Sequence, residues 1–302
     1  MPDQDLIELR KMIAANPLPA NLEALRLSAD ADSQRFPLDP DINTERELVA
    51  IGVPAEWTWT AAADPARVVL YLHGGGYVFG SILSHRHLVA EIGRASGSRT
   101  LAIDYRLSPE NPFPAAVDDA LASYRFLLER GFDPRHIALV GDSAGGGLVV
   151  STLVAIKEAG LPQPVCGWVI SPWVDMEASG ETFVSRSDTD PMVKREIIVN
   201  FAQTYLNGAD PRSPFASPIH ADLRGIAPLL IHVGASEVLL DDSLKLARTA
   251  GAADVSVRLE IWPEMVHIWH VFHRILGDGR KAVQAGAKFL REAMDGRANH
   301  RS

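Results

Sequence analysis

One serine of the sequence has the neighbours of an enzymatic nucleophile. Ser143 lies in Gly141-Asp142-Ser143-Ala144-Gly145, which matches G-x-S-x-G. Small residues on both sides permit a sharp turn that exposes the serine hydroxyl. The apolar run Ile137–Val140 predicts a strand before the motif, and residues 145–156 predict a helix after it. Because a nucleophile elbow joins a strand to a helix, this context favours attack on a carbonyl carbon over an idle serine in a glycine-rich turn.

A second motif could stabilise the negative charge that such an attack creates. His73-Gly74-Gly75-Gly76-Tyr77 directly follows the apolar run Val68–Leu72. Three consecutive glycines let backbone N–H groups approach a ligand closely. One fixed donor typically stabilises a developing oxyanion by about 3–4 kcal/mol. Neither G-x-G-x-x-G nor G-x-x-x-x-G-K occurs here, which argues against a nucleotide phosphate site.

A serine nucleophile needs a carboxylate and then a histidine base, in that chain order. Three histidines follow the last predicted strand, at His267, His270 and His273. We expect His267 to be the base, and the other two to line the helix that follows. A spacing of three residues turns these side chains progressively around a helix, which argues against a metal site. No metal or organic cofactor is expected.

The elements that must position these residues alternate along the chain. Short continuous apolar runs are typical of parallel strands buried on both faces. They are separated by helix-length segments, and this alternation predicts a doubly wound α/β fold. A hairpin over 46–52 and 55–60 precedes them. The apolar runs are 68–72, 100–103, 137–140, 167–170, 229–233 and 255–261, and the helical segments are 84–96, 114–130, 144–159, 240–251 and 279–294.

One segment, residues 178–218, interrupts this alternation and contains no strand-like run. An insertion of this length between strands is usually functional, often as a lid. Within it, Asp190-Pro191 predicts the start of a helix that runs to about Leu206, with Asp190 as the N-cap.

Composition limits the partners and the compartment. The 302 residues carry 29 basic and 38 acidic side chains, a net charge of −9, with no basic stripe, so we expect no nucleic-acid partner. The apolar stretches are too short to span a bilayer, and the first residues lack the apolar core of a signal peptide, so no membrane association is expected. The single thiol, Cys166, excludes an internal disulfide. We predict a cytoplasmic protein with a small-molecule substrate.

Three blocks together resemble the hormone-sensitive-lipase-like esterases, the bacterial family IV carboxylesterases. They are the glycine motif at 73–77, the segment from Asp104-Tyr105-Arg106-Leu107-Ser108-Pro109-Glu110 to Pro112-Phe113-Pro114-Ala115-Ala116, and the elbow at 141–146. The resemblance extends from about residue 66 to about residue 295. It implies a serine carboxylesterase that hydrolyses short to medium acyl-chain esters through an acyl-enzyme intermediate. The same triad can cleave amides, so an amidase or deacetylase is an alternative, as is a non-catalytic ligand-binding protein of this fold.

The resemblance also implies an architecture. The α/β-hydrolase fold has a mostly parallel eight-stranded sheet with helices on both faces and a helical cap. Residues 1–45 and 178–218 would form the cap, and residues 46–177 and 219–302 the core. Members of the family often form dimers, and the predicted edge strand at 255–261 could pair between two subunits of a homodimer.

Particular residues follow from the same resemblance. The N–H groups of Gly75, Gly76 and Ala144 would form the oxyanion hole. Glu237, in Glu237-Val238-Leu239-Leu240-Asp241, stands where the family commonly has the aspartate of Asp-Pro-Leu-x-Asp, so Glu237 is expected to orient the histidine base. Asp241 is the rival for this role. In the family the matching aspartate supports the site instead.

Other side chains in these motifs are expected to support the site. We expect Asp142 to brace the elbow, and the tripeptide Asp104-Tyr105-Arg106, with Asp104 and Arg106 as its charged members, to brace the glycine loop through an ion pair or a hydrogen bond. His73 is expected to hold the loop by hydrogen bonding and not to transfer a proton. Tyr77 follows the loop and is expected to form a wall of the acyl pocket.

Overall fold

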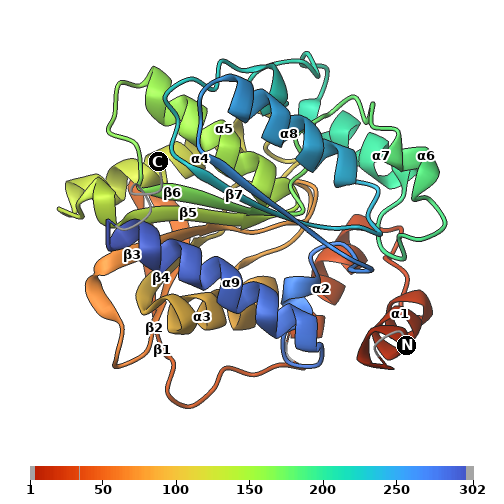
Figure 1. Cartoon of the computed structure of the whole chain (residues 1–302), viewed down its shortest axis with the longest axis horizontal. Helices are drawn as coiled ribbons and strands as arrows, with labels where there is room; N and C mark the ends of the chain where they lie inside the picture. The colour runs from red at the N-terminus through yellow and green to blue at the C-terminus, as the bar shows by residue number, and fades with distance from the viewer. Residues whose placement is uncertain (1–3, 34, 297–302) are drawn as a thin grey trace.

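The apolar runs of the sequence form one twisted sheet at the centre of the molecule (Figure 1). In the computed structural model, which describes residues 4–33 and 35–296, the sheet has eight strands in the order β1-β2-β4-β3-β5-β6-β7-β8. The strands β3 to β8 are parallel, and β1 and β2 form an antiparallel hairpin that joins the sheet beside β4. The strands are β1 (Asn43–Val49), β2 (Val53–Trp59), β3 (Asp64–Leu72), β4 (Ser98–Ile103), β5 (Ile137–Asp142), β6 (Cys166–Ile170), β7 (Leu229–Gly234) and β8 (Val257–Trp262).

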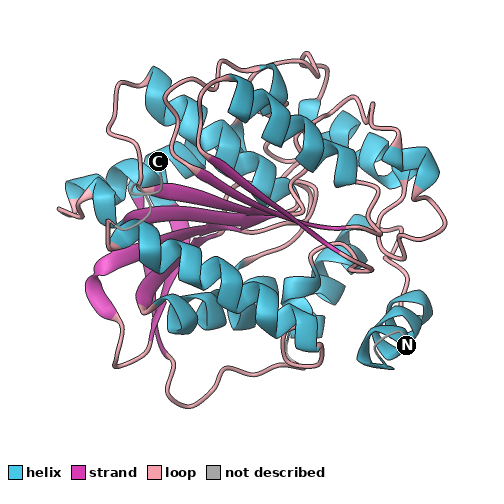
Figure 2. Cartoon of the chain, viewed as in Figure 1, coloured by secondary structure: helices cyan, strands magenta, loops and turns pink. Residues whose placement is uncertain are grey.

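Helices cover both faces of this sheet (Figure 2). Alternate residues of β3 show why. Val68, Leu70 and Leu72 pack into the core beneath α4 (Ala115–Glu129) and α5 (Ala144–Glu158), whereas Val69 and Tyr71 pack towards α3 (Ile82–Ser96) and α9 (Gly277–Met294). All five are fully buried, as continuous apolar strands require when both faces are covered. The helix α8 (Leu240–Ala252) lies on the α5 side. The predicted α/β fold is confirmed, with element ends that shift by a few residues.

The N-terminal segment and the insertion lie at one end of the sheet, where the parallel strands end (Figure 1). The first contains α1 (Gln4–Ala15) and α2 (Leu22–Ser33), and the second contains α6 (Thr182–Ser185) and α7 (Arg195–Leu206). Arg10 on α1 joins the two, because its guanidinium donates 2.8 Å to the carbonyl of Thr189 and 2.9 Å to that of Glu264. The division into a cap and a core stays a prediction.

The predicted helix start at Asp190-Pro191 is wrong, because α7 begins at Arg195. The carboxylate of Asp190 is fully buried and is used elsewhere. One oxygen accepts from the N–H groups of Met192 and Val193, both at 2.9 Å, and the other from Val238 N–H at 2.9 Å. Asp190 therefore stabilises a turn and ties the insertion to the loop after β7, so the helix starts further along the chain.

Four short 3-10 helices complete the elements of the described residues. They are η1 (Ala50–Gly52), η2 (Pro134–His136), η3 (Pro218–His220) and η4 (Trp269–Phe272). Among residues 4–33 and 35–296, no helix combines the length and the apolar character that crossing a bilayer requires.

Candidate active site

The turn between β5 and α5 presents Ser143. The backbone of Ser143 has φ 53° and ψ −120°, a conformation that L residues rarely adopt and that costs about 1–3 kcal/mol. The turn is tight because the flanking glycines leave no room for a side chain. A Cβ atom on Gly145 would overlap the carbonyl oxygens of Leu72 and His73, and one on Gly141 would overlap the backbone of Gly145. The G-x-S-x-G pattern is therefore required sterically.

A continuous chain of hydrogen bonds leads from Ser143 to a buried carboxylate. His267 Nε2 lies 2.9 Å from Ser143 Oγ, and His267 Nδ1 lies 2.8 Å from Glu237 Oε2. Ser143 follows β5, Glu237 follows β7 and His267 follows β8, so all three side chains come from the carboxyl ends of parallel strands on one side of the sheet. Asp241 is not part of this chain, because its carboxylate accepts from Thr182 N–H at 3.0 Å.

The protonation of His267 is set by this neighbourhood. Burial lowers the pKa of His267, but the hydrogen bond and the charge of Glu237, together with nearby carboxylates, leave this pKa above its usual 6.5. Asp190 and Asp142 act in the same direction. For Glu237, burial raises the pKa, and hydrogen bonds from His267, Ser171 and Gly234 oppose that rise.

Three backbone donors lie in the two loops beside Ser143. Within residues 4–33 and 35–296, no protein acceptor is recorded for the N–H groups of Gly75, Gly76 and Ala144. Gly75 has φ 116° and Gly76 has φ 60°, conformations that favour glycine. The N–H of Gly74 differs, because it donates 3.1 Å to Asp142 Oδ1. The loop thus leaves donors for a ligand at the positions predicted for the oxyanion hole.

Asp142 connects this loop to the elbow. Its fully buried carboxylate accepts from Tyr71 Oη at 2.6 Å in addition to Gly74 N–H, and lies 3.2 Å from His85 Nε2. Burial lowers the pKa of His85, but the charge of Asp142 and its hydrogen bond raise it by more. Because the elbow and the glycine loop share one carboxylate, their relative position is restrained.

His73 and Tyr105 hold the start of the loop. Burial lowers the pKa of His73 to about 3, so this imidazole is neutral at physiological pH, and its Nδ1 lies 2.7 Å from Gly74 O. Tyr105 Oη donates 2.7 Å to His73 O, and the two rings stack with centroids 4.2 Å apart. Of the tripeptide Asp104-Tyr105-Arg106, which the sequence proposes as a brace of the loop, Tyr105 is the residue that contacts His73.

The side chains of Asp104 and Arg106 bind residues outside the glycine loop, contrary to expectation. Asp104 Oδ1 accepts from Ile82 N–H at 2.6 Å, at the start of α3. Arg106 pairs with the fully buried Asp119 on α4, with Nη2 at 2.7 Å from Oδ1. The expected brace of the glycine loop is therefore supplied by Tyr105, and these two side chains anchor the segment that carries it.

Tyr77 has φ 63° and is almost fully buried. Its ring stacks on Tyr205 of α7, with centroids 3.8 Å apart and planes at 6°. A Cβ atom on the neighbouring Gly76 would overlap the ring of Phe201, also on α7. The insertion therefore packs directly on the glycine loop. The role of Tyr77 as a pocket wall stays a prediction.

The prediction that the other two histidines line the helix after His267 holds only for His270. His270 lies on η4, and His273 follows it; both are buried ahead of α9, which begins at Gly277. His270 Nε2 lies 3.0 Å from His232 Nδ1, and burial keeps the pKa of His270 well below its usual value. No group of potential metal ligands occurs among the described residues.

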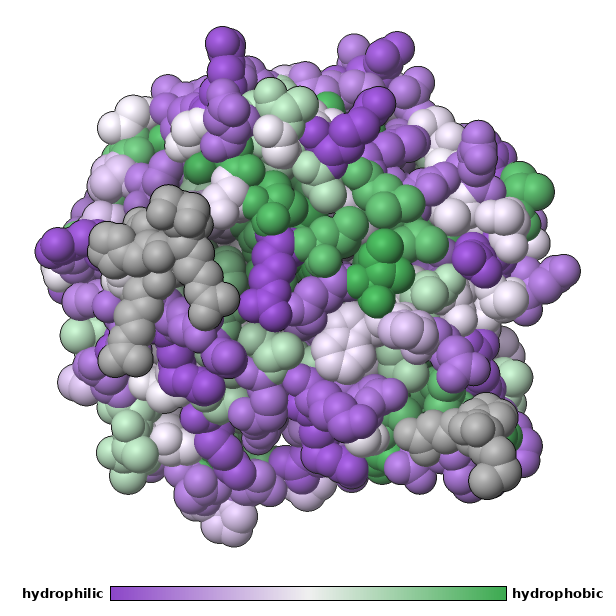
Figure 3. All heavy atoms as spheres, in the orientation of Figure 1, coloured by the Kyte–Doolittle hydropathy of each residue, from purple (hydrophilic) through white to green (hydrophobic). Residues whose placement is uncertain are grey.

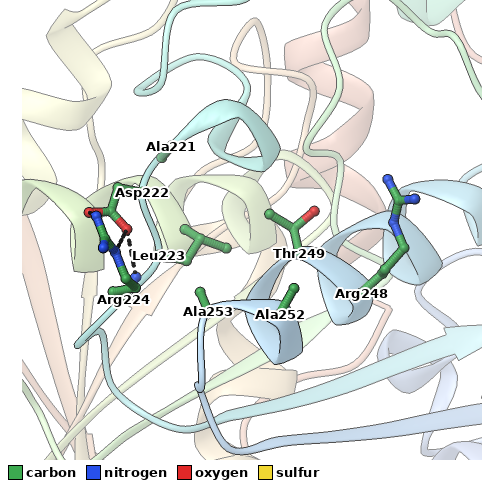
Figure 4. A pocket seen from close by; sticks show the side chains of 8 residues that line it. All are labelled: Ala221, Asp222, Leu223, Arg224, Arg248, Thr249, Ala252 and Ala253. Atoms are coloured by element: carbon green, nitrogen blue, oxygen red, sulfur yellow. Dashed lines mark hydrogen bonds and ion pairs between the residues drawn. The ribbon is translucent and has the colours of Figure 1, made fainter.

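A surface hollow of about 440 Å³ lies away from these residues (Figure 4). It is formed by the end of α8 and the segment before β7, where Asp222 and Arg224 pair on one side and Arg248 points away on the other. It is lined by Ala221, Asp222, Leu223, Arg224, Arg248, Thr249, Ala252 and Ala253. None of these belongs to the Ser143 site.

Known proteins resemble this chain along most of its length. A model of the α/β hydrolase fold matches residues 69–271. The acetyl-hydrolase of Streptomyces hygroscopicus is 47% identical over 248 residues, which cover 82% of this chain and 83% of the relative. The carboxylesterase NlhH of Mycobacterium tuberculosis is 30% identical over 269 residues, 84% of each protein.

A solved structure agrees with these relatives. The crystal structure of an esterase from the bacterial hormone-sensitive lipase family matches with a TM-score of 0.94 at 46% identity, covering 97% of this chain and 99% of that one.

Proposed function

The chain belongs to the bacterial hormone-sensitive lipase family of the α/β-hydrolase fold and is a carboxylic ester hydrolase, and from this premise we propose that it acts through a Ser143–His267–Glu237 triad. The observation that carries the proposal is the buried chain of hydrogen bonds at 2.9 and 2.8 Å that links the three side chains. Its order matches a nucleophile, a general base and an orienting acid.

The proposed reaction has two halves. His267 Nε2 accepts the proton of Ser143 Oγ while Oγ bonds to the ester carbonyl carbon, and the carbonyl oxygen becomes an oxyanion. The N–H groups of Gly75, Gly76 and Ala144 donate to this oxyanion. The tetrahedral intermediate collapses, the C–O bond to the alcohol breaks, and the proton on His267 passes to the departing alkoxide, which leaves an acyl-enzyme.

Water completes the cycle. His267 Nε2 accepts a proton from water as the water oxygen attacks the acyl carbon. When the second tetrahedral intermediate collapses, the C–O bond to Ser143 breaks, and Oγ takes the proton back from His267 while the acid is released. Throughout, Glu237 keeps the Nδ1–H tautomer of His267 and stabilises the imidazolium.

We propose that the substrates are esters with short to medium acyl chains. The acetyl-hydrolase named above supports a small acyl group. The aromatic side chains Phe201 and Tyr205 of α7 pack against Gly76 and Tyr77, which limits the space beside the proposed oxyanion donors. An amidase or deacetylase with the same triad is the alternative.

Hydrolysis of p-nitrophenyl esters from acetate to palmitate tests the proposal. Ser143→Ala, His267→Ala and Glu237→Gln are expected to lose most of the activity, and the matched Asp241→Asn variant to keep it. An activity optimum at a long acyl chain contradicts the substrate proposal. Loss of activity in Asp241→Asn but not in Glu237→Gln contradicts the assigned acid. Faster cleavage of acetanilides than of acetate esters favours the deacetylase, and binding without turnover favours a ligand-binding protein.

We also propose a homodimer formed through β8. This strand is an edge of the sheet, and its Ile261 is 44% exposed. Apolar side chains gather near the middle of the face on which Figure 1 shows β8, α8 and α9 (Figure 3). An exposed apolar edge strand is a template for pairing with a second copy. Light scattering is expected to give the mass of a dimer, and that of a monomer for Ile261→Lys; a wild-type monomer contradicts the proposal.

The remaining parts of the proposal concern organisation and compartment. We propose that residues 1–45 and 178–218 act as a cap on the site, that the protein is cytoplasmic, and that it binds neither nucleic acid nor membrane. The net charge of −9 supports the lack of a nucleic-acid partner. Cell fractionation tests the compartment.

A further inference from the structure

We propose that Ser171 is a positioning residue for the triad, whose hydroxyl holds Glu237 and fixes the turn that carries His267. This inference rests on the proposed function, because it requires Glu237 to orient His267. Ser171 is fully buried and directly follows β6.

One oxygen atom of Ser171 contacts both the acid and the base loop. Ser171 Oγ donates 2.7 Å to Glu237 Oε1, and the same Oγ accepts from Ile268 N–H at 3.1 Å. Ile268 is the residue directly after His267. A hydroxyl can donate once and accept at the same time, so both contacts are satisfied together.

The backbone directs the Ser171 side chain into this position. Ser171 has φ 48°, a left-handed conformation that a non-glycine residue adopts at a cost. Its N–H donates 2.7 Å to His232 O at the neighbouring strand, which holds this conformation. The preceding carbonyl, that of Ile170, accepts from Ser143 N–H at 2.8 Å. The end of β6 therefore contacts the nucleophile, the acid and the base loop within two residues.

The longer side chain of glutamate explains why such a contact is needed. Glu237 has one more rotatable bond than an aspartate would have, so its carboxylate has more freedom to lose when it binds His267. Oε2 faces His267, and Oε1 is held by Ser171 Oγ and by Gly234 N–H at 2.5 Å. With both oxygens fixed, the carboxylate plane cannot turn away from the imidazole.

The test is a double-mutant cycle on the full-length enzyme with p-nitrophenyl acetate. Ser171→Ala removes a hydrogen bond to a charged group and is expected to lower kcat about 10–100-fold, with little change in KM. The matched control is Ser151→Ala, another fully buried serine, on α5, whose hydroxyl has no partner among the described residues. This control is expected to keep the wild-type kcat.

The second arm repeats Ser171→Ala in a Glu237→Ala background. If Ser171 acts through Glu237, the additional loss is at least about threefold smaller than in the wild-type background, and the part that remains reports the contact with Ile268 N–H. An equal loss in both backgrounds indicates a merely structural role and overturns the proposal, as does a wild-type kcat for Ser171→Ala. If Ser171→Ala does not fold, Ser171→Cys, which keeps a weak donor of similar size, is expected to show an intermediate loss with the same dependence on Glu237.

The failure of this inference and that of the proposed function give different results. If Glu237→Ala itself keeps full activity, the proposed triad is wrong. If Glu237→Ala loses activity but Ser171→Ala and Ser171→Cys do not, the triad stands and only the role of Ser171 is refuted.

Discussion

Removing one hydroxyl, that of Tyr105, tests how the glycine loop is held. Tyr105 Oη donates 2.7 Å to the carbonyl oxygen of His73, the first residue of the loop, and both residues are buried. Tyr105→Phe deletes this donor without removing the ring that stacks on His73. The variant therefore separates the hydrogen bond from the packing.

The expected loss of stability follows from the buried carbonyl group that Tyr105→Phe leaves without a donor. No other donor to His73 O is recorded among the described residues, so the buried carbonyl loses its partner. Such a loss costs about 1–3 kcal/mol of folding free energy. Displacement of the Gly75 and Gly76 N–H groups should weaken their binding to the proposed oxyanion. If this raises the activation free energy by about 1 kcal/mol, kcat falls roughly 3–10-fold. KM is expected to change little.

The matched control is Tyr124→Phe. Tyr124 Oη donates to Pro162 O at the same 2.7 Å, and Tyr124 is also fully buried, but it lies on α4 outside the site. Urea unfolding and steady-state kinetics on both variants are the assay. Both should lose comparable stability, and only Tyr105→Phe should lose kcat. Equal kcat values for the two variants would refute the idea that Tyr105 positions the oxyanion donors.

Three further predictions concern pH, the elbow and the support of the loop. The proposed mechanism requires neutral His267, whose pKa lies above 6.5, so kcat/KM should fall as the pH drops through a value above 6.5; a midpoint below 6.5 in a pH–rate profile contradicts this expectation. Gly145→Ala places a Cβ against Leu72 O, which belongs to the central sheet and cannot move, so a loss of about 2–3 kcal/mol or more in urea unfolding is expected, together with activity. Arg106→Ala leaves the buried carboxylate of Asp119 without its cation. The Arg106 side chain is half exposed, and the backbone N–H of residue 106 still donates 2.8 Å to Asp119 Oδ2. Calorimetry should therefore show about 2–3 kcal/mol of lost stability, less than the loss of a fully buried pair.

The strands and the elbow turn that carries Ser143 could be predicted because their signals are local. Each buried parallel strand is a short apolar run, and the elbow needs small residues at fixed positions around Ser143. The same holds for the glycine loop. These patterns are imposed by sterics within a few residues, and so they are visible without knowledge of the rest of the chain.

The errors arose where a side chain had two possible partners. Asp190 before Pro191 has the local pattern of a helix start, but its second carboxylate oxygen binds Val238 N–H, which lies far along the chain. Similarly, three residues in a row, from Asp104 to Arg106, could have braced the glycine loop. Only Tyr105 reaches it, because the strand end turns its hydroxyl towards His73.

By itself the sequence predicted the α/β fold, which the structure confirms, and it proposed Ser143 as the nucleophile together with a short list of bases and acids that follow the last strands. The sequence favoured Glu237 over Asp241 as the proposed acid only through the family resemblance, and the tertiary structure supports this choice because Glu237 alone of the two lies beside His267. The parallel register of β5 to β8 brings the strand ends together, so Glu237 meets His267 while Asp241 faces Thr182. The contact of Ser171 with both Glu237 and Ile268 has the same origin, since it joins the ends of three strands that are distant in sequence and adjacent in space.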